Sequence, residues 1–189
     1  MAASLKQAVR KHCSGSNGLL QDGPGLAQYC QHVQVFAALT GTLTGQEARE
    51  SMLYTLNHPE IPQCSVAMGY YLFRALEITG LYQHTDALWN KWRKMLSNHL
   101  TTCQESDGDY VRSDCHAWGA LALYELPSAI LGIRPAKPGY SSVRFSPTPG
   151  VLTCAEGQVI TPKGLIRAGW KMEKGEIQKW ITLPEGLTL

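Results

Sequence analysis

The chain has 189 residues, of which 44% are hydrophobic and 17% are charged, and its formal net charge is +2. This composition is ordinary for a globular protein with one good core, or with a core and a small appended domain. The net charge is too small, and the Lys and Arg residues are too dispersed, to favour nucleic-acid binding. We therefore predict a folded protein whose partners do not include nucleic acid.

The N-terminal residues MAASLKQAVRKHC are charged and amphipathic, and they lack the apolar block of a signal peptide. Nowhere does the chain hold an uninterrupted apolar run of the roughly 18 residues that a membrane-spanning helix needs. We expect a cytoplasmic protein that makes no contact with a membrane.

The cysteines are dispersed, with neither the CxxC spacing nor the companion histidines of a zinc site. They are Cys13, Cys30, Cys64, Cys103, Cys115 and Cys154. We expect reduced, mostly buried thiols, with disulfides as the less favoured alternative. No metal site and no other cofactor is predicted.

The first 135 residues show the three- and four-residue apolar spacing of α-helices. The spacing predicts helices at residues 2–11, 26–39, 46–56, 66–80, 85–100 and 115–126. Thr44 and Glu47 have the spacing of a capping box before the third helix. Nearly all-apolar helices alternate with helices that have one wet face, which suggests antiparallel hairpins packed in two layers, as in a toroid. The predicted helices are too few to close a ring of six hairpins.

From residue 136 onward, short β-type runs are separated by Gly and Pro. Strands are predicted at residues 143–145, 151–154, 158–161, 165–171 and 176–182, with hairpin turns at Lys163-Gly164 and Lys174-Gly175. In the fourth run Ile166, Ala168 and Trp170 alternate with Arg167, Gly169 and Lys171, which is the period of a sheet with one buried face.

The predicted fold class is therefore α then β. Residues 1–135 would form α-helical hairpins, and residues 136–189 a small antiparallel β-sandwich. Another strand should begin where the residues LPEGLTL close the sequence, so we expect the sandwich to be truncated.

One irregular segment between two predicted helices gathers carboxylates, a histidine, a cysteine pair and a tryptophan. It is residues 100–118, LTTCQESDGDYVRSDCHAW. Loops on a rigid scaffold are where polar side chains converge into sites, so Glu105 and His116 are candidates for chemistry. Asp107, Asp109 and Asp114 are read instead as solubilising residues or as a cap for the next helix. On composition alone, a solvated acidic loop is the favoured alternative.

Several motifs in this region and beyond it resemble one enzyme family. They are TTCQE at residues 101–105, RSDCHAWGA at 112–120, LYELPSAILGIRPAKPGY at 123–140, VRFSPTPG at 143–150 and YCQHVQVFAALTG at 29–41. Together they resemble the C-terminal end of the bacterial α-L-rhamnosidases, glycoside hydrolase family 78, with Cys30 in place of a serine in the last motif. The resemblance implies the end of a six-hairpin (α/α)6 barrel followed by a C-terminal β-sandwich domain.

The resemblance also implies roles for particular residues. The family's catalytic base is a Glu that closes a Thr-Thr-x-x-Glu-like stretch, and Glu105 matches it; a His in the SDCHAW-type segment contacts the sugar, and His116 matches that position. Trp118 is the expected pocket wall. Asp22 and His32 are weaker candidates for substrate binding, because the family places polar side chains from the matching helix near the barrel centre.

Two departures from the family affect the expected activity. Many relatives carry an aromatic residue near Cys103, and a smaller thiol there would open one wall of the sugar pocket. The family's general acid lies in an earlier segment that this sequence does not contain. An inverting glycosidase needs both carboxyl groups, so we expect the chain to be inactive alone.

Three functions remain open on the sequence. The leading hypothesis is the C-terminal portion of an inverting α-L-rhamnosidase, whose partners are a rhamnose-containing glycoside or oligosaccharide and the missing upstream half of the barrel. A non-catalytic carbohydrate-binding or scaffold protein of the same fold is the alternative. A helical domain that acts only as a protein-interaction surface is the third.

The tryptophans Trp89 and Trp92 are expected in the core rather than against a sugar.

Overall fold

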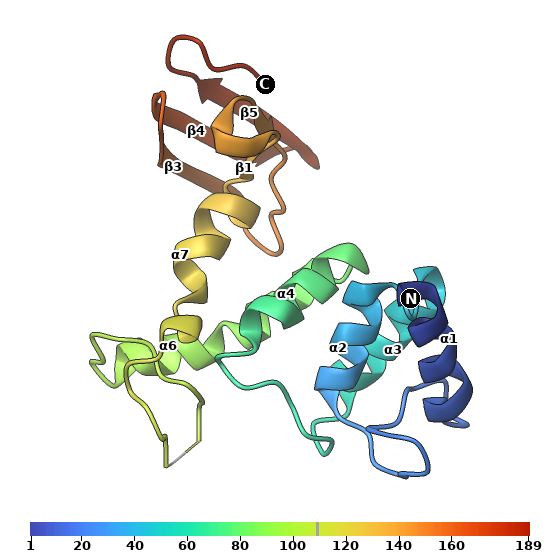
Figure 1. Ribbon diagram of the computed structural model, residues 1–189. Helices are drawn as coiled ribbons and strands as arrows, with labels where there is room; N and C mark the ends of the chain where they lie inside the picture. Colours follow the sequence, from blue (N-terminus) through green and yellow to red (C-terminus); the bar gives the residue numbers. More distant parts are fainter. Residues whose placement is uncertain (109) are drawn as a thin grey trace. The chain divides into compact units, whose positions relative to one another are not determined.

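A computed structural model describes residues 1–108 and 110–189 (Figure 1). The chain divides into two compact units, residues 1–119 and residues 120–189, and each is described by itself. The domain boundary between residues 135 and 136 stays a prediction. Within the part that the structure describes, no helix combines the length and the apolar character needed to cross a membrane.

The first unit is helical. Its α-helices are α1 (Ala2–Cys13), α2 (Gln31–Thr40), α3 (Gly45–Asn57), α4 (Gly69–Ile78), α5 (Thr85–Leu88) and α6 (Asn90–Ser97), with short 3-10 turns η1 (Tyr82–His84) and η2 (Ala117–Gly119). Helix α2 packs against both α3 and α4. Val35, Met52, Phe73 and Leu76, on these three helices, are completely buried. Their burial stabilises this unit.

Helix α2 begins five residues later than the apolar spacing predicts. Cys30 is extended, with φ −136° and ψ 160°, and the Gln31 N–H donates to the carbonyl oxygen of Pro62 at 2.9 Å. The backbone before Gln31 is therefore committed to loop hydrogen bonds. The predicted stop is confirmed, because Gly41 adopts the left-handed conformation that ends many helices, with φ 67°.

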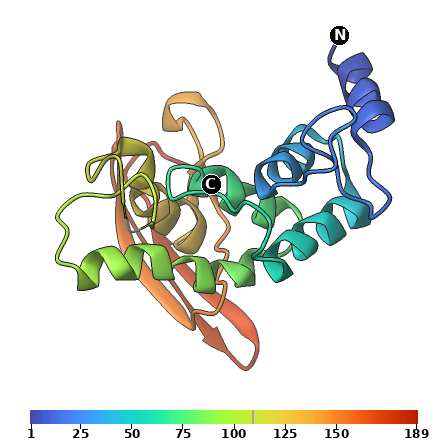
Figure 2. The ribbon, with the colours of Figure 1, turned by 90° about the horizontal axis from the view of Figure 1, so that it is seen from below.

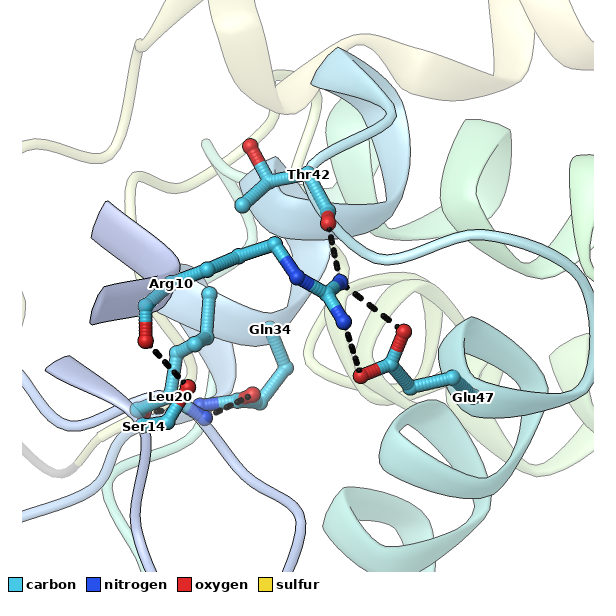
Figure 3. A network of polar contacts seen from close by, with 6 residues as sticks. All are labelled: Arg10, Ser14, Leu20, Gln34, Thr42 and Glu47. Carbon is cyan, nitrogen blue, oxygen red and sulfur yellow. Dashed lines mark hydrogen bonds and ion pairs between the residues drawn. The ribbon is translucent and has the colours of Figure 1, made fainter. Parts of the chain in front are cut away.

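The predicted capping box before α3 is wrong. Thr44 makes no side-chain capping hydrogen bond, and Glu47 instead accepts two hydrogen bonds of 2.9 Å from the guanidinium of Arg10. Arg10 also donates to the carbonyl oxygen of Thr42 at 2.7 Å (Figure 3). These contacts tie α1 to α3, and the hydrogen bond and charge of Glu47 raise the pKa of Arg10.

A buried glutamine holds the loop before α2 in place. The side chain of Gln34 is fully buried; its Oε1 accepts from the N–H of Leu20 at 3.0 Å, and its Nε2 donates to the Leu20 carbonyl oxygen at 2.6 Å (Figure 3). Ser51 on α3 donates to the same Oε1 at 3.0 Å. The amide thus replaces the hydrogen bonds that the Leu20 backbone would otherwise make with water.

The single helix predicted at residues 85–100 is two helices, α5 and α6, which meet at Trp89. The core role predicted for its tryptophans is confirmed: Trp89 and Trp92 lie edge-on to Phe73, with ring centroids 5.0 and 6.1 Å away. Leu96, which the helical period places on the inner face, is 73% exposed. Trp92 and Met95 carry the buried face of α6.

The second unit is mainly β. It holds α7 (Leu121–Glu125), the π-helical turn η3 (Leu126–Ile130), β1 (Ile133–Pro135), the 3-10 turn η4 (Pro138–Tyr140), β2 (Val143–Phe145), β3 (Cys154–Thr161), β4 (Gly164–Glu173) and β5 (Glu176–Thr182). Strands β1 and β2 form one antiparallel pair, and β3, β4 and β5 form a second antiparallel sheet in that order. A helical region followed by small antiparallel sheets confirms the predicted fold class.

The second hairpin of the larger sheet turns where the sequence predicts, at Lys174-Gly175, whereas the first turns at Pro162-Lys163, one residue before the predicted pair. Lys174 and Gly175 both have positive φ, 52° and 84°, as a two-residue hairpin turn requires. The strands predicted at residues 151–154 and 158–161 are one strand, β3, which starts at Cys154. On β4 Ile166, Ala168 and Trp170 are buried and Arg167 and Lys171 are exposed, as the alternation predicts, but Gly169 is buried as well.

These buried residues of β4 share one core with the smaller sheet. Ile133 of β1 and Val143 of β2 belong to the same apolar cluster. The indole N–H of Trp170 donates to the carbonyl oxygen of Ile130 at 2.8 Å, so this large side chain is buried without an unsatisfied donor.

All six thiols are free, as expected, but the prediction that most are buried is wrong. Only Cys13 and Cys64 are buried, whereas Cys115 and Cys154 are exposed. Across residues 1–108 and 110–189, no three His, Cys, Asp or Glu side chains gather in a group that could hold a metal ion.

Candidate functional site

The candidate site lies on the long irregular connection between α6 and η2 (Figures 1 and 2). Two limbs of this connection are joined by backbone hydrogen bonds: the N–H of Glu105 donates to the Ser113 carbonyl oxygen at 3.0 Å, and the N–H of His116 donates to the Cys103 carbonyl oxygen at 2.8 Å. These two bonds place Glu105 and His116 on facing limbs. Asp109 lies outside the described residues.

The loop is also fastened to the helical core. The N–H of Ala67 donates to the Glu105 carbonyl oxygen at 3.0 Å, and the indole N–H of Trp92 donates to the Gly119 carbonyl oxygen at 2.7 Å. A Cβ atom at Gly119 would lie 2.5 Å from the carbonyl oxygen of Gln104. Only glycine allows this close approach. The connection ends in the short turn η2, so the continuous helix predicted at residues 115–126 is wrong.

The Glu105 carboxylate is bound by a neighbouring arginine. Arg112 Nε donates to Oε2 at 2.8 Å and Arg112 Nη2 donates to Oε1 at 2.5 Å. The side chain of Glu105 is 23% exposed, whereas that of Arg112 is 81% exposed. The hydrogen bonds from Arg112 lower the pKa of Glu105. Burial raises this pKa, and the charges of Arg112 and His116 lower it further. Glu105 is therefore a carboxylate at neutral pH.

His116 and Trp118 lie beside this carboxylate. His116 Nε2 is 4.0 Å from Glu105 Oε1, and the Trp118 ring stands nearly perpendicular to the imidazole with centroids 6.0 Å apart. Trp118 is 65% exposed. His116 Nδ1 is buried and has no hydrogen-bond partner among the residues described. Buried polar atoms without partners are uncommon, and a bound water or ligand is one explanation for them.

The other acidic residues of the loop support its shape. Asp107 accepts from Lys91 Nζ at 3.4 Å, and the same ammonium donates to the Cys64 carbonyl oxygen at 2.9 Å. The Asp114 carboxylate accepts from Gln104 Nε2 at 2.9 Å, and its backbone carbonyl accepts from the Thr102 hydroxyl. Asp107 thus links the loop to Lys91 of α6, and Asp114 links the two limbs of the loop.

The weaker candidates lie at the start of α2. The Asp22 carboxylate accepts a hydrogen bond from the thiol of Cys30; burial, and then this bond, raise the pKa of Cys30. His32 is half-buried. In the described part of the chain, no hydrogen bond or ion pair joins Asp22 or His32 to Glu105 or His116.

The first residue of α2 and the Glu105 loop nevertheless contact the same short segment, residues 62–67. Pro62 accepts from the N–H that starts α2, and Ala67 donates to Glu105. Gln31, the first residue of α2, is fully buried, and its Oε1 accepts from the Cys64 N–H at 2.9 Å. Gln31 therefore positions the segment at residues 62–67.

Arg112 was not singled out by the sequence reasoning, although it is the residue in direct contact with the Glu105 carboxylate. Its position, seven residues after Glu105 in an irregular stretch, has no helical or strand periodicity that would predict the pair. The RSDCHAW motif, which begins at Arg112, was the available signal.

Comparison with known proteins finds similarity to one family of enzymes. Residues 132–189 match the family model described as bacterial alpha-L-rhamnosidase C-terminal domain. No curated protein sequence matches the chain at a significant level.

Solved structures match almost the whole chain. The GH78 family rhamnosidase of Bacillus sp. GL1 is 29% identical with a TM-score of 0.81, over 97% of this chain and 22% of that enzyme. The α-L-rhamnosidase of Aspergillus terreus is 18% identical with a TM-score of 0.79, over 98% of this chain and 23% of that enzyme. The Streptomyces avermitilis α-L-rhamnosidase, solved with L-rhamnose, is 17% identical with a TM-score of 0.75, over 98% of this chain and 19% of that enzyme.

The chain thus spans less than a quarter of the length of these enzymes. The family model covers the β region, and the structural matches extend over the helical region before it. The chain is thus similar to the C-terminal part of family 78 α-L-rhamnosidases over nearly its whole length, and its residues 132–189 match the bacterial α-L-rhamnosidase C-terminal domain.

Proposed function

We propose that this chain carries the water-activating half of an inverting α-L-rhamnosidase site, with Glu105 as general base and His116 and Trp118 as contacts to a terminal α-L-rhamnosyl residue. The observation that carries the proposal is the ionised Glu105 carboxylate, held 4.0 Å from the His116 imidazole on a loop fastened to the helical core. The structural relatives named as rhamnosidases support the choice of sugar.

Inversion at an anomeric carbon needs a base on one face of the sugar ring and an acid on the other. A carboxylate at Glu105 accepts a proton from water as the water oxygen bonds to the anomeric carbon, while a second carboxyl group protonates the departing glycosidic oxygen. The second carboxyl group is proposed to come from an upstream half of the barrel. Without that acid, the rate falls by about 10²- to 10⁴-fold, so the chain alone is proposed to be inactive.

Arg112 competes with water for the Glu105 carboxylate. It donates one hydrogen bond to each oxygen of Glu105. Each oxygen keeps a lone pair that can accept from water, but the pairing with Arg112 lowers the basicity of the carboxylate. The Arg112 side chain is 81% exposed, and its charge can be solvated as it turns away. Release of one of the two hydrogen bonds would leave the other to orient the carboxylate.

The neighbouring side chains supply sugar contacts of two kinds. His116 has a buried nitrogen without a partner among the described residues, so a water or hydroxyl that reaches the imidazole would gain a hydrogen bond. The exposed ring of Trp118 offers a flat apolar surface to the C–H groups of a pyranose. Asp22 and His32 are proposed as more distant contacts, reached through the segment at residues 62–67.

A second candidate function is a non-catalytic carbohydrate-binding or scaffold protein of the same fold. The bidentate Arg112–Glu105 pair favours it, because a carboxylate with both oxygens engaged is a rigid binding element rather than a free base. In this alternative the loop keeps its sugar contacts and performs no chemistry.

Two measurements test the proposal. The chain alone should show no turnover of an aryl α-L-rhamnoside, and an upstream barrel half added in trans should restore it; robust turnover by the chain alone would refute the claim that the site is incomplete. Calorimetric titration with L-rhamnose separates the candidates. Sugar binding by a complemented protein without any turnover would favour the binding protein, and His116→Ala should weaken that binding at the loop in either case.

A further inference from the structure

The outer face of the β3-β4-β5 sheet carries a flat-lying indole. On β4, Gly169 sits opposite Trp180 of β5 in register, and a Cβ atom at Gly169 would lie 2.5 Å from the Trp180 ring. Trp180 therefore lies across the sheet in the space that the missing side chain leaves. Trp180 is 46% exposed, so part of its apolar surface faces solvent.

Polar side chains of both charges surround this indole. Residues opposite each other in an antiparallel sheet point to the same face. Glu156 pairs with Gly169, and Arg167 pairs with both Gln158 and Thr182. A hollow of about 550 Å³ is lined by Glu156, Gly157, Gln158, Arg167, Trp180 and Thr182.

The polar atoms in this hollow are free to bind a ligand. In the described part of the chain, Glu156, Gln158, Arg167 and Thr182 make no side-chain hydrogen bond or ion pair with other residues. Together they offer guanidinium and amide donors, carboxylate and amide acceptors, and a hydroxyl that can do both. One acidic and one basic residue leave the hollow with no net charge, which disfavours a polyanion such as nucleic acid.

We infer that this hollow is a second saccharide-binding site, centred on Trp180 and independent of Glu105. A pyranose is matched to it chemically: its C–H face packs on the exposed indole while its hydroxyl groups exchange hydrogen bonds with Glu156, Gln158 and Arg167. The site lies within residues 154–182, so the inference does not depend on the function proposed for the loop.

The inference is tested by NMR titration of the full chain with methyl α-L-rhamnopyranoside and methyl α-D-glucopyranoside. At least one glycoside should bind at millimolar strength and shift the indole N–H resonance of Trp180 with the amides of residues 156–158, 167 and 182. Trp180→Ala should weaken binding at least tenfold, Trp180→Phe should restore part of it, and Arg167→Ala, an exposed change that leaves the core intact, should weaken it severalfold.

Controls separate this site from the loop. Glu105→Gln and His116→Ala should leave the Trp180 shifts unchanged, even if they abolish shifts at residues 103–118. The inference is overturned if neither glycoside moves the Trp180 resonance, or if Trp180→Ala and Arg167→Ala both bind as tightly as the parent chain. Self-association that buries Trp180 and is lost in Trp180→Ala, detected by sedimentation, would identify the face as a protein contact and would also overturn it.

Discussion

His116 Nε2 lies 4.0 Å from Glu105 Oε1 across the two limbs of one loop. The two side chains come from positions eleven residues apart by sequence number, and the backbone bonds at Glu105 and His116 bring them together. The carboxylate is shared between this imidazole and the guanidinium of Arg112. The charge state of Glu105 is thus set by its loop neighbours, and it can be changed by substitutions at those neighbours.

Arg112→Ala should raise the pKa of Glu105 toward its ordinary value of about 4.3, because the largest cause of its lowering is the hydrogen bonding from Arg112. A ¹³C NMR titration of the side-chain carboxyl group measures the change. Arg93→Ala is the matched control, since it removes an exposed arginine that binds Asp86 instead. An unchanged or lower pKa of Glu105 in Arg112→Ala would contradict this electrostatic description.

The same pair makes stability depend on pH at the acid end. The pKa of Glu105 is lower in the folded chain than in the unfolded chain, so its contribution is complete above the unfolded pKa and is lost as the pH falls through the folded pKa. Urea midpoints measured between pH 7 and pH 2 should fall more steeply for the parent chain than for Arg112→Ala. Parallel curves would show that Arg112 does not set this dependence.

Gly119→Ala should destabilise the first unit by about 1–3 kcal/mol, the usual cost of an overpacked site. The new Cβ atom would meet the Gln104 carbonyl oxygen at 2.5 Å and push apart the loop that carries Glu105. Urea unfolding measures the loss. Gly108→Ala, on the same connection with nothing within 4 Å of its added Cβ, should change the free energy of unfolding by less than about 0.5 kcal/mol; equal effects of the two substitutions would refute the steric argument.

Gln34→Leu should cost about 2–6 kcal/mol of unfolding free energy, because it leaves both backbone groups of Leu20 buried and unsatisfied, at about 1–3 kcal/mol each. Chemical denaturation with a linear extrapolation gives the value. Gln46→Leu provides the exposed counterpart and should have little effect. If Gln34→Leu were as stable as the parent chain, the Gln34–Leu20 network would not be what holds this loop.

The cysteines should differ sharply in reactivity toward iodoacetamide. Burial raises the pKa of Cys64 to about 12, so its thiolate is scarce at pH 8, whereas Cys115 and Cys154 are exposed. Peptide mass spectrometry after brief alkylation of the folded chain should find Cys115 and Cys154 modified and Cys64 intact, with Cys64 reacting after denaturation. Early labelling of Cys64 would show that the segment at residues 62–67 opens readily.

Local patterns predicted the β region well because its signals are local. The Lys174-Gly175 turn and the alternation around Ala168 depend on neighbours in sequence, and both are present in the structure. The helical region was less predictable where long-range contacts decide the outcome. Glu47 bonds Arg10 rather than the N-terminus of its own helix.

The same distinction applies to the candidate site. Glu105 and His116 could be named from motif spacing, and the structure brings them to 4.0 Å. Arg112 could not be paired with Glu105 from spacing, because irregular backbone gives no period from which to predict a contact. Asp22 and His32 were named through a family resemblance, and their place in a sugar site stays a prediction.

The most direct test of the central claim is the turnover of an aryl α-L-rhamnoside by the chain complemented with an upstream barrel half. With Glu105→Gln, kcat should fall by about 10²- to 10⁴-fold, as expected for the loss of a general base, while Asp107→Asn on the same loop should retain kcat within a few fold. Equal kcat values for Glu105→Gln and the parent chain would contradict the assignment of Glu105 as the base.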